Sequence, residues 1–253
     1  MGKYSIDETT LTSAADAIRE KTGGTDVIDP VDFPSKVDEV FAAGKKTEEA
    51  ERWRNGIENV SSAIGLFSGR SWNDQTFKPQ TNIVLKGSAN NCFYNCGVTD
   101  LDSAMKESGF TLDTSGVTST VAFSSYARIT NFPRLDFTGC SKLQQTFTSH
   151  SALLSATIVL AAKTTYTSVF TGCTNLVDLI VEGTIGQNGF DASPCESLSA
   201  DSGESIINAL STTTTGLTVT LPLAWSETFM NKYDATTYSD LIASRANWTI
   251  SLV

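Results

Sequence analysis

The stretch Phe170-Thr-Gly-Cys173-Thr-Asn-Leu176 decides the fold, because its pattern recurs along the chain. It aligns with Phe147-Thr-Ser-His150-Ser-Ala-Leu153, which lies one period earlier. A further step of nearly the same length reaches Phe123-Ser-Ser-Tyr126-Ala-Arg-Ile129, and a longer step reaches Phe93-Tyr-Asn-Cys96-Gly-Val98. A second apolar position recurs between these stretches: Leu112, Leu135, Val159 and Val181. The recurrence predicts that the four phenylalanines stack in one dry interior column.

A period in the low twenties, with Leu, Asn and Cys at fixed offsets, is typical of a leucine-rich-repeat solenoid. No single repeat of this size buries its own apolar side, so stacking of neighbours must supply the core. We therefore predict an α+β fold class, in which N-terminal helices precede a leucine-rich-repeat-like solenoid. The predicted domains are a helical attachment or oligomerisation region, residues 1–68, and the solenoid, residues 69–253, with a C-terminal α/β cap from about residue 190.

Charge separates these two parts. Residues 1–60 hold 13 acidic and 8 basic side chains, whereas the remainder is rich in Thr, Ser, Gly and β-branched residues. Apolar residues keep three-four spacing from Ser35 onward, which predicts one long or kinked helix from about Ser35 to Asn59. Both a solvated single helix and a coiled coil between subunits fit this pattern. The apolar contact line of such a coiled coil could be formed by Trp53, Ile57, Val60 and Ile64.

The repeat fades after Gly189, and other elements follow. An acidic start before Ile206 predicts a helix, and Leu217-Thr-Val-Thr-Leu221 alternates as a strand does. Residues 225–233 and 238–245 are predicted helices, and Trp248-Thr-Ile-Ser-Leu252 is a predicted final strand. An atypical terminal unit of this kind would shield the last repeat.

Composition excludes several classes of function. The chain has 253 residues, a net charge of −10 and one histidine, so it lacks the clustered cations that nucleic acid or an anionic membrane requires. No stretch is long and apolar enough for a membrane span, and the start has no apolar signal-peptide core. Five cysteines without a C-x-x-C pair indicate reduced, buried thiols, made in a cytoplasm.

A search for catalytic chemistry favours structural roles. His150 shares its offset with Cys96, Tyr126 and Cys173, so we interpret it as a buried position of the repeat rather than a base or ligand. Cys140 aligns with Val117 and is interpreted as a small apolar filler. Cys92 lies close before Cys96 in sequence without other thiol or imidazole partners, which does not favour a metal site.

Two acidic residues keep a catalytic alternative open. Asp113 and Asp136 share a repeat offset and would lie on neighbouring repeats, at a spacing compatible with glycoside cleavage. Capping of a turn is the simpler interpretation of such residues, and of Asp74 as well. Gly183-Thr-Ile-Gly186-Gln-Asn-Gly189 is interpreted as a turn that closes a repeat, not a phosphate loop. We expect no enzyme activity and assign no catalytic, cofactor-binding, metal or ligand-binding residue.

The chain resembles BspA-type leucine-rich-repeat proteins from tail and minor structural gene clusters of phages and prophages of Gram-positive gut bacteria. The resembling stretches include residues 170–176, 198–210, 246–250 and 71–79, and the opening at 11–22 followed by 28–37. The chain departs from the usual pattern at Phe123 and Phe147, where the Gly-Cys pair is replaced. The resemblance implies a virion or surface recognition module and no catalytic residues.

The function expected from this resemblance is that of a non-enzymatic phage tail-tip or baseplate-associated protein, structural or receptor-binding. The N-terminal helices would bind other tail or baseplate proteins, and the solenoid would recognise a host surface glycan or protein. Proteins that it resembles imply a homotrimer, located in the virion tail and made in the bacterial host cytoplasm. The alternative is a bacterial cell-surface adhesin, and a third class is a carbohydrate-active enzyme. We expect no nucleic acid partner and no membrane insertion.

Overall fold

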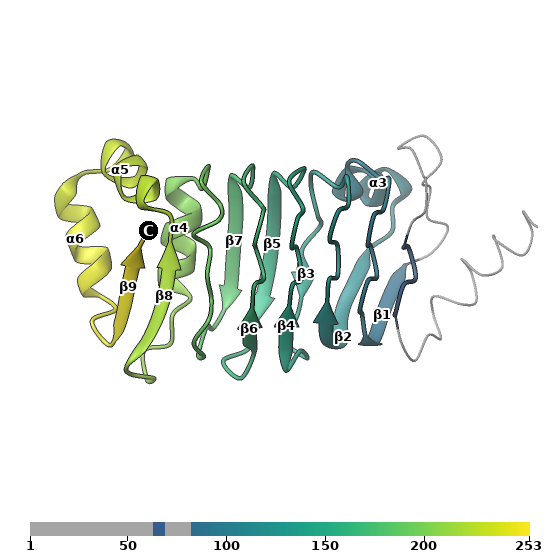
Figure 1. The fold of residues 1–253 in the computed structure, drawn as a ribbon, viewed down its shortest axis with the longest axis horizontal. Helices are drawn as coiled ribbons and strands as arrows, with labels where there is room; N and C mark the ends of the chain where they lie inside the picture. Colours follow the sequence, from purple (N-terminus) through teal and green to yellow (C-terminus); the bar gives the residue numbers. More distant parts are fainter. Residues whose placement is uncertain (1–62, 69–81) are drawn as a thin grey trace, which may run out of the picture. The chain divides into compact units, whose positions relative to one another are not determined.

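Short parallel strands form most of the fold. The computed structural model describes residues 63–68 and 82–253, which belong to one unit of the chain, Ile57–Val253. Its strands, labelled in Figure 1, are β1 Ile83–Ser88, β2 Leu112–Val121, β3 Leu135–Asp136, β4 Lys142–Gln144, β5 Ser155–Leu160, β6 Thr165–Thr167, β7 Asp178–Gly183, β8 Leu217–Leu221 and β9 Trp248–Leu252. Its helices are α3 Leu101–Ser108, α4 Ala200–Asn208, α5 Leu223–Lys232 and α6 Ala235–Ala243.

The strands belong to three separate parallel sheets. Their orders are β1-β2-β4-β6, β3-β5-β7 and β8-β9. Leu135 pairs with Ile158, which pairs with Val181, so the register advances by the same interval at each step. Because parallel partners lie level with one another, residues one interval apart fall into columns, and the columns that face inward are apolar.

The fold class predicted from the sequence is wrong. The described residues form a mixed α/β fold of three small parallel sheets and four short helices, not a leucine-rich-repeat-like solenoid. A leucine-rich repeat adds one strand per repeat to a single uninterrupted sheet. Here the strands from β2 to β7 alternate between two sheets, α3 interrupts the succession between β1 and β2, and the two-stranded sheet β8-β9 stands apart. The repeated spacing reflects the pairing of short strands and the stacking of the turns between them, and it does not require a single sheet.

A column of phenylalanine rings forms much of the core. The rings of Phe93, Phe123, Phe147 and Phe170 have no exposed surface. Successive centroids are 5.2, 6.4 and 5.7 Å apart, which confirms the dry column predicted from the repeat. Two rings that the repeat did not include extend it, Phe67 at 4.7 Å from Phe93 and Phe190 at 5.7 Å from Phe170. Truncating one such ring to alanine costs about 3–5 kcal/mol in a packed core.

The predicted alignment is wrong by one residue at Tyr126. The backbone N–H of Ala127 donates to Ser124, as that of His150 donates to Phe147, so Ala127 is the equivalent of His150. Ala127 is buried, whereas Tyr126 is 58% exposed. The buried column that Tyr126 was expected to join is Cys96, Ala127, His150, Cys173 and Cys195. The error arose because the position equivalent to Phe147 on this turn is Ser124. Phe123 reaches the same column of rings from the inward position one residue earlier.

Helix α3 explains the long step after Phe93, and the sequence did not predict it. Asp100 begins the helix, because its carboxylate accepts from the Ser103 N–H at 2.9 Å. Gly109 ends it in the left-handed conformation, at φ 72°. The helix and its caps are therefore an insertion between two stacked turns.

Helix α4 closes the sheet β3-β5-β7 where a fourth strand would lie. The Ser202 hydroxyl accepts from the Leu179 N–H at 2.8 Å and donates to the Val177 carbonyl at 3.0 Å. The Ser205 hydroxyl likewise accepts from the Val181 N–H at 2.8 Å. These hydroxyls satisfy backbone groups of an edge strand that would otherwise be open to pairing with another chain.

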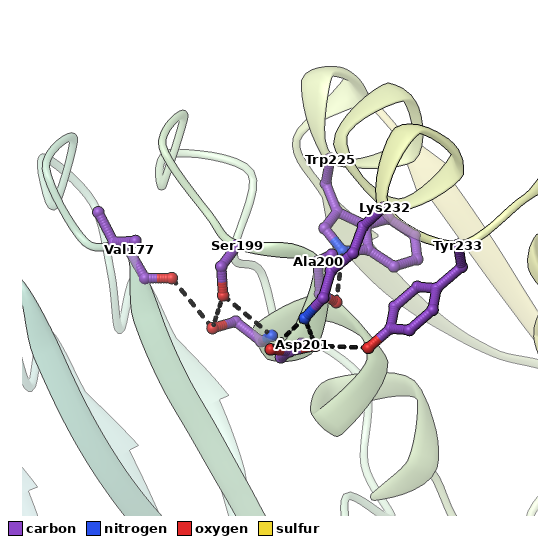
Figure 2. A network of polar contacts seen from close by, with 8 residues as sticks. Val177, Ser199, Ala200, Asp201, Trp225, Lys232 and Tyr233 are labelled. Atoms are coloured by element: carbon purple, nitrogen blue, oxygen red, sulfur yellow. Dashed lines mark hydrogen bonds and ion pairs between the residues drawn. The ribbon is translucent and has the colours of Figure 1, made fainter.

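Helix α5 packs onto α4, as Figure 2 shows. Trp225 of α5 lies against Gly203, where an added Cβ would meet the indole at 2.0 Å, and its ring nitrogen donates to the Ala200 carbonyl. At the surface, Asp201 accepts from Lys232 and, at 2.6 Å, from the Tyr233 hydroxyl. The bond from Lys232 and that from Tyr233 lower the pKa of Asp201.

The elements predicted after residue 190, α4, β8, α5, α6 and β9, are all present within a few residues of their expected bounds.

Candidate functional site

Four five-residue turns lie side by side, and we name them the turn face: residues 91–95, 122–126, 145–149 and 168–172. Backbone hydrogen bonds join each turn to the next. The Asn95 N–H donates to the second turn at 2.9 Å, the Ser124 N–H to the third at 2.9 Å, and the Ser149 N–H to the fourth at 2.7 Å. The residues that begin and end the turns all have positive φ: Asn91, Asn95, Ala122, Tyr126, Gln145, Ser149, Ser168 and Gly172. The turns are therefore a rigid, repeated scaffold.

The turn face carries no formal charge. None of its residues is Asp, Glu, Lys or Arg, although 18% of the chain is charged. Its exposed side chains are two tyrosines with amides and hydroxyls, including Asn91, Asn95 and Gln145. Such a surface offers hydrogen-bond donors and acceptors without attracting ions.

Two exposed tyrosines lie next to each other on this face. The rings of Tyr94 and Tyr126 have centroids 5.7 Å apart and planes at 70°. Tyr94 is 38% exposed and Tyr126 is 58% exposed. The backbone of Tyr126 has a φ of 57°, a conformation that a bulky residue rarely adopts. The equivalent positions carry Asn95, Ser149 and Gly172, residue types better suited to it.

These features suit binding better than catalysis. An aromatic ring offers a face to apolar C–H groups, and amides and hydroxyls bind the polar groups around them. The turn face brings together no pair of groups that could exchange a proton near neutral pH. The arrangement can hold a ligand that combines apolar faces with hydroxyls.

The buried pair Ser124–His150 has the contact of a nucleophile and base but no access. The Ser124 hydroxyl and His150 Nδ1 are 3.0 Å apart, and Nε2 lies 2.7 Å from the Ile129 carbonyl. Because a carbonyl only accepts, Nε2 carries the proton and Nδ1 accepts from Ser124. Burial lowers the pKa of His150 to about 4. Neither side chain has exposed surface, so no external substrate reaches the pair in this conformation.

The two candidate carboxylates cap turns. Asp113 accepts from the Ser115 N–H at 2.9 Å, and Asp136 accepts from the Thr138 N–H at 2.9 Å. Asp191 makes the same bond two residues ahead. This repeated contact is an Asx turn, the simpler of the two interpretations that the sequence allowed.

The cysteines are core residues. All five are free and buried. The Cys140 thiol donates to the Val117 carbonyl, and burial raises its pKa to about 12. Burial also raises the pKa of Cys92 and of Cys96. Among residues 63–68 and 82–253 no group of three or more metal-ligating side chains occurs.

Other predicted positions have structural roles or lie outside the described residues. The Gly183–Gly189 stretch forms a turn in which both end glycines have positive φ, and a Cβ at Gly183 would meet the Leu160 carbonyl at 2.2 Å. Asp74 and the helix predicted from Ser35 to Asn59 lie outside the described residues. In the part of the chain that the structure describes, no helix is long and apolar enough to span a bilayer.

A hollow of about 590 Å³ lies where α5 begins, and none of the residues that line it belongs to the turn face. It is lined by Ser193, Pro194, Glu196, Pro222, Leu223, Ala224 and Val253. The lining has one acidic side chain, Glu196, and one hydroxyl, that of Ser193, and its other side chains are apolar. It provides no convergent set of polar groups for a specific ligand.

Comparison with protein-family models, curated proteins and solved structures finds no match to this chain. The candidate site therefore rests on its own residues. Sequence reasoning missed Tyr94 and placed Tyr126 in the core. Two signals could have found the pair: Asn95 and Gly172 mark a left-handed position that Tyr126 shares, and charged residues are missing from all four turns.

Proposed function

We propose that this chain is a non-enzymatic, tail-tip or baseplate-associated protein of a phage particle that recognises the host surface through its turn face. The observation that carries the proposal is the exposed pair Tyr94 and Tyr126 on an uncharged, rigid scaffold. Tyrosine is enriched among the residues that dominate binding energy at interfaces, so the exposed pair on this scaffold supports a recognition surface.

The resemblance to tail and minor structural proteins supports placement on the particle. In this proposal residues 1–68 attach the protein to other tail or baseplate components, as a homotrimer. The turn face then points its ligand-binding side chains towards a host surface glycan or protein. The protein is made in the cytoplasm of the bacterial host and is carried in the virion tail.

Location tests this proposal directly. Virions purified on a density gradient should contain the chain in a fixed ratio to a major tail protein, measured by quantitative mass spectrometry. Antibody labelling should place it at the tail tip in electron micrographs. Recovery from the cell wall of a strain without the prophage would instead favour the adhesin alternative, and recovery free in the cytoplasm of such a strain would refute both. Sedimentation of the full chain should give three times the 27.1 kDa monomer mass.

A further inference from the structure

We infer that Tyr94 and Tyr126 form a binding corner for a neutral, pyranose-containing glycan. The inference rests on the proposed recognition function and names the ligand class for that same site. It commits to one occupant, an uncharged polysaccharide of the host surface, rather than an anionic polymer or a protein.

The ring geometry fits a sugar. Two rings at 70° with centroids 5.7 Å apart present two sides of a corner, and both rings reach solvent. A pyranose has an apolar C–H face and a rim of hydroxyls. Its C–H face can lie on the more exposed ring, Tyr126, while the rim meets the second ring and the amides of neighbouring turns. Asn95 lies on the turn beside Tyr126, because its N–H donates to Ser125 at 2.9 Å.

The absence of charged side chains on the turn face favours a neutral ligand. Phosphate and carboxylate groups are bound in proteins by Arg, Lys or clustered backbone N–H groups. The turn face supplies no Arg or Lys, and backbone N–H groups along it donate to the neighbouring turn. The chain as a whole carries a net charge of −10, which repels polyanions. Two cations lie close to the face in sequence, Arg128, two residues beyond Tyr126, and Lys142, three residues before Gln145; the test below removes Arg128, which is the nearer to the tyrosine pair in sequence.

A protein partner is less well matched. Interfaces that bind proteins have a fully buried apolar core with a polar rim. Around the two rings the other exposed side chains of the turn face are amides and hydroxyls, without an aliphatic side chain to extend an apolar core. Two rings within a polar surface match a sugar ring rather than a helix or strand.

The backbone conformation of Tyr126 is unfavourable for a bulky aromatic residue. Tyr126 is a bulky residue at φ 57°, where asparagine and glycine stand on equivalent turns, and its ring is more than half exposed. Both features are unfavourable for stability, and strain of this kind concentrates at functional sites. Tyr126→Asn should therefore fold at least as stably as the wild type while losing the platform.

The experiment measures binding of the full chain to three immobilised preparations from Gram-positive gut bacteria: phosphate-free neutral cell-wall polysaccharide, teichoic acid, and cell-surface protein. Variants are Tyr126→Asn and Tyr94→Ser. Tyr233→Ser is a matched control, because Tyr233 is 41% exposed and directly follows α5, outside the turn face. Arg128→Gln tests the neighbouring cation. Urea midpoints are measured for every variant.

Binding should occur to the neutral polysaccharide and disappear after periodate cleavage of its vicinal diols. Tyr126→Asn and Tyr94→Ser should each weaken it by about tenfold, with unchanged or higher urea midpoints for Tyr126→Asn. Tyr233→Ser and Arg128→Gln should bind as the wild type does. Binding only to teichoic acid with loss in Arg128→Gln, binding only to protein, or no loss in Tyr126→Asn would each overturn the inference. If the chain is found in virions but binds no neutral polysaccharide, the ligand class fails while the proposed function stands.

Discussion

Replacing His150 by glutamine should remove a pH-dependent loss of stability that the wild-type chain shows between pH 7.5 and 5. Burial lowers the pKa of His150 in the folded chain to about 4, against an ordinary value near 6.5 when unfolded. Between these values the unfolded state binds more protons, so stability falls as the pH falls through this window. At pH 5 the loss relative to pH 7.5 amounts to about 2 kcal/mol.

Glutamine is chosen because its amide can donate to the Ile129 carbonyl and accept from the Ser124 hydroxyl without titrating. Urea unfolding of both proteins is followed by tryptophan fluorescence at pH 7.5 and pH 5. Carboxylates contribute equally to both, and His150 is the one histidine of the chain, so the difference between the two pH dependences isolates this imidazole. Parallel pH dependences, within about 0.5 kcal/mol, would show that His150 titrates normally and would refute its burial between Ser124 and Ile129.

Three further changes test the packing. Gly203→Ala, whose new Cβ would meet the Trp225 indole, should lower the free energy of unfolding by about 1–3 kcal/mol. Glu204→Ala on the same helix should change it by less than about 0.5 kcal/mol. Equal effects of the two substitutions in urea titrations would contradict the close approach of Gly203 to Trp225. Ser202→Ala, which leaves the Leu179 N–H of β7 unpaired, should cost about 1–3 kcal/mol, against little for the exposed Ser197→Ala. The five buried cysteines should not react with a thiol reagent at pH 8 in the native chain and should all react in urea; rapid labelling of any one in the native chain would show that it is exposed.

The sequence predicted local features of the fold more successfully than its architecture. Periodic phenylalanines predicted the ring column, because an apolar ring that recurs at a regular interval must be buried wherever the chain stacks on itself. The helices and strands after residue 190 were also predicted, since caps such as Ser199 and alternation such as that of β8 act locally. The partition of strands into separate sheets depends on which backbone groups pair across the molecule, and residue spacing does not specify it.

The candidate site was harder to predict for a related reason. A shift of one residue in the alignment turned Tyr126 from a surface residue into a core residue, because Tyr126 is exposed whereas the residue after it, Ala127, is buried. Phe123 caused the shift: its ring joins the column from a position that Thr146 and Val169 occupy on later turns. The α3 insertion also lies between Tyr94 and Tyr126 in sequence, so the regular repeat interval does not predict that their rings are neighbours.

Hydroxyl-radical footprinting of the full chain, with and without saturating neutral cell-wall polysaccharide, tests the binding corner most directly. Tyr94 and Tyr126 should be oxidised in the free protein and protected in the complex, while Tyr233, directly after α5, should be oxidised equally in both. Unchanged oxidation of Tyr94 and Tyr126 in the presence of bound polysaccharide, or protection confined to α5 and α6, would show that the turn face is not the recognition surface.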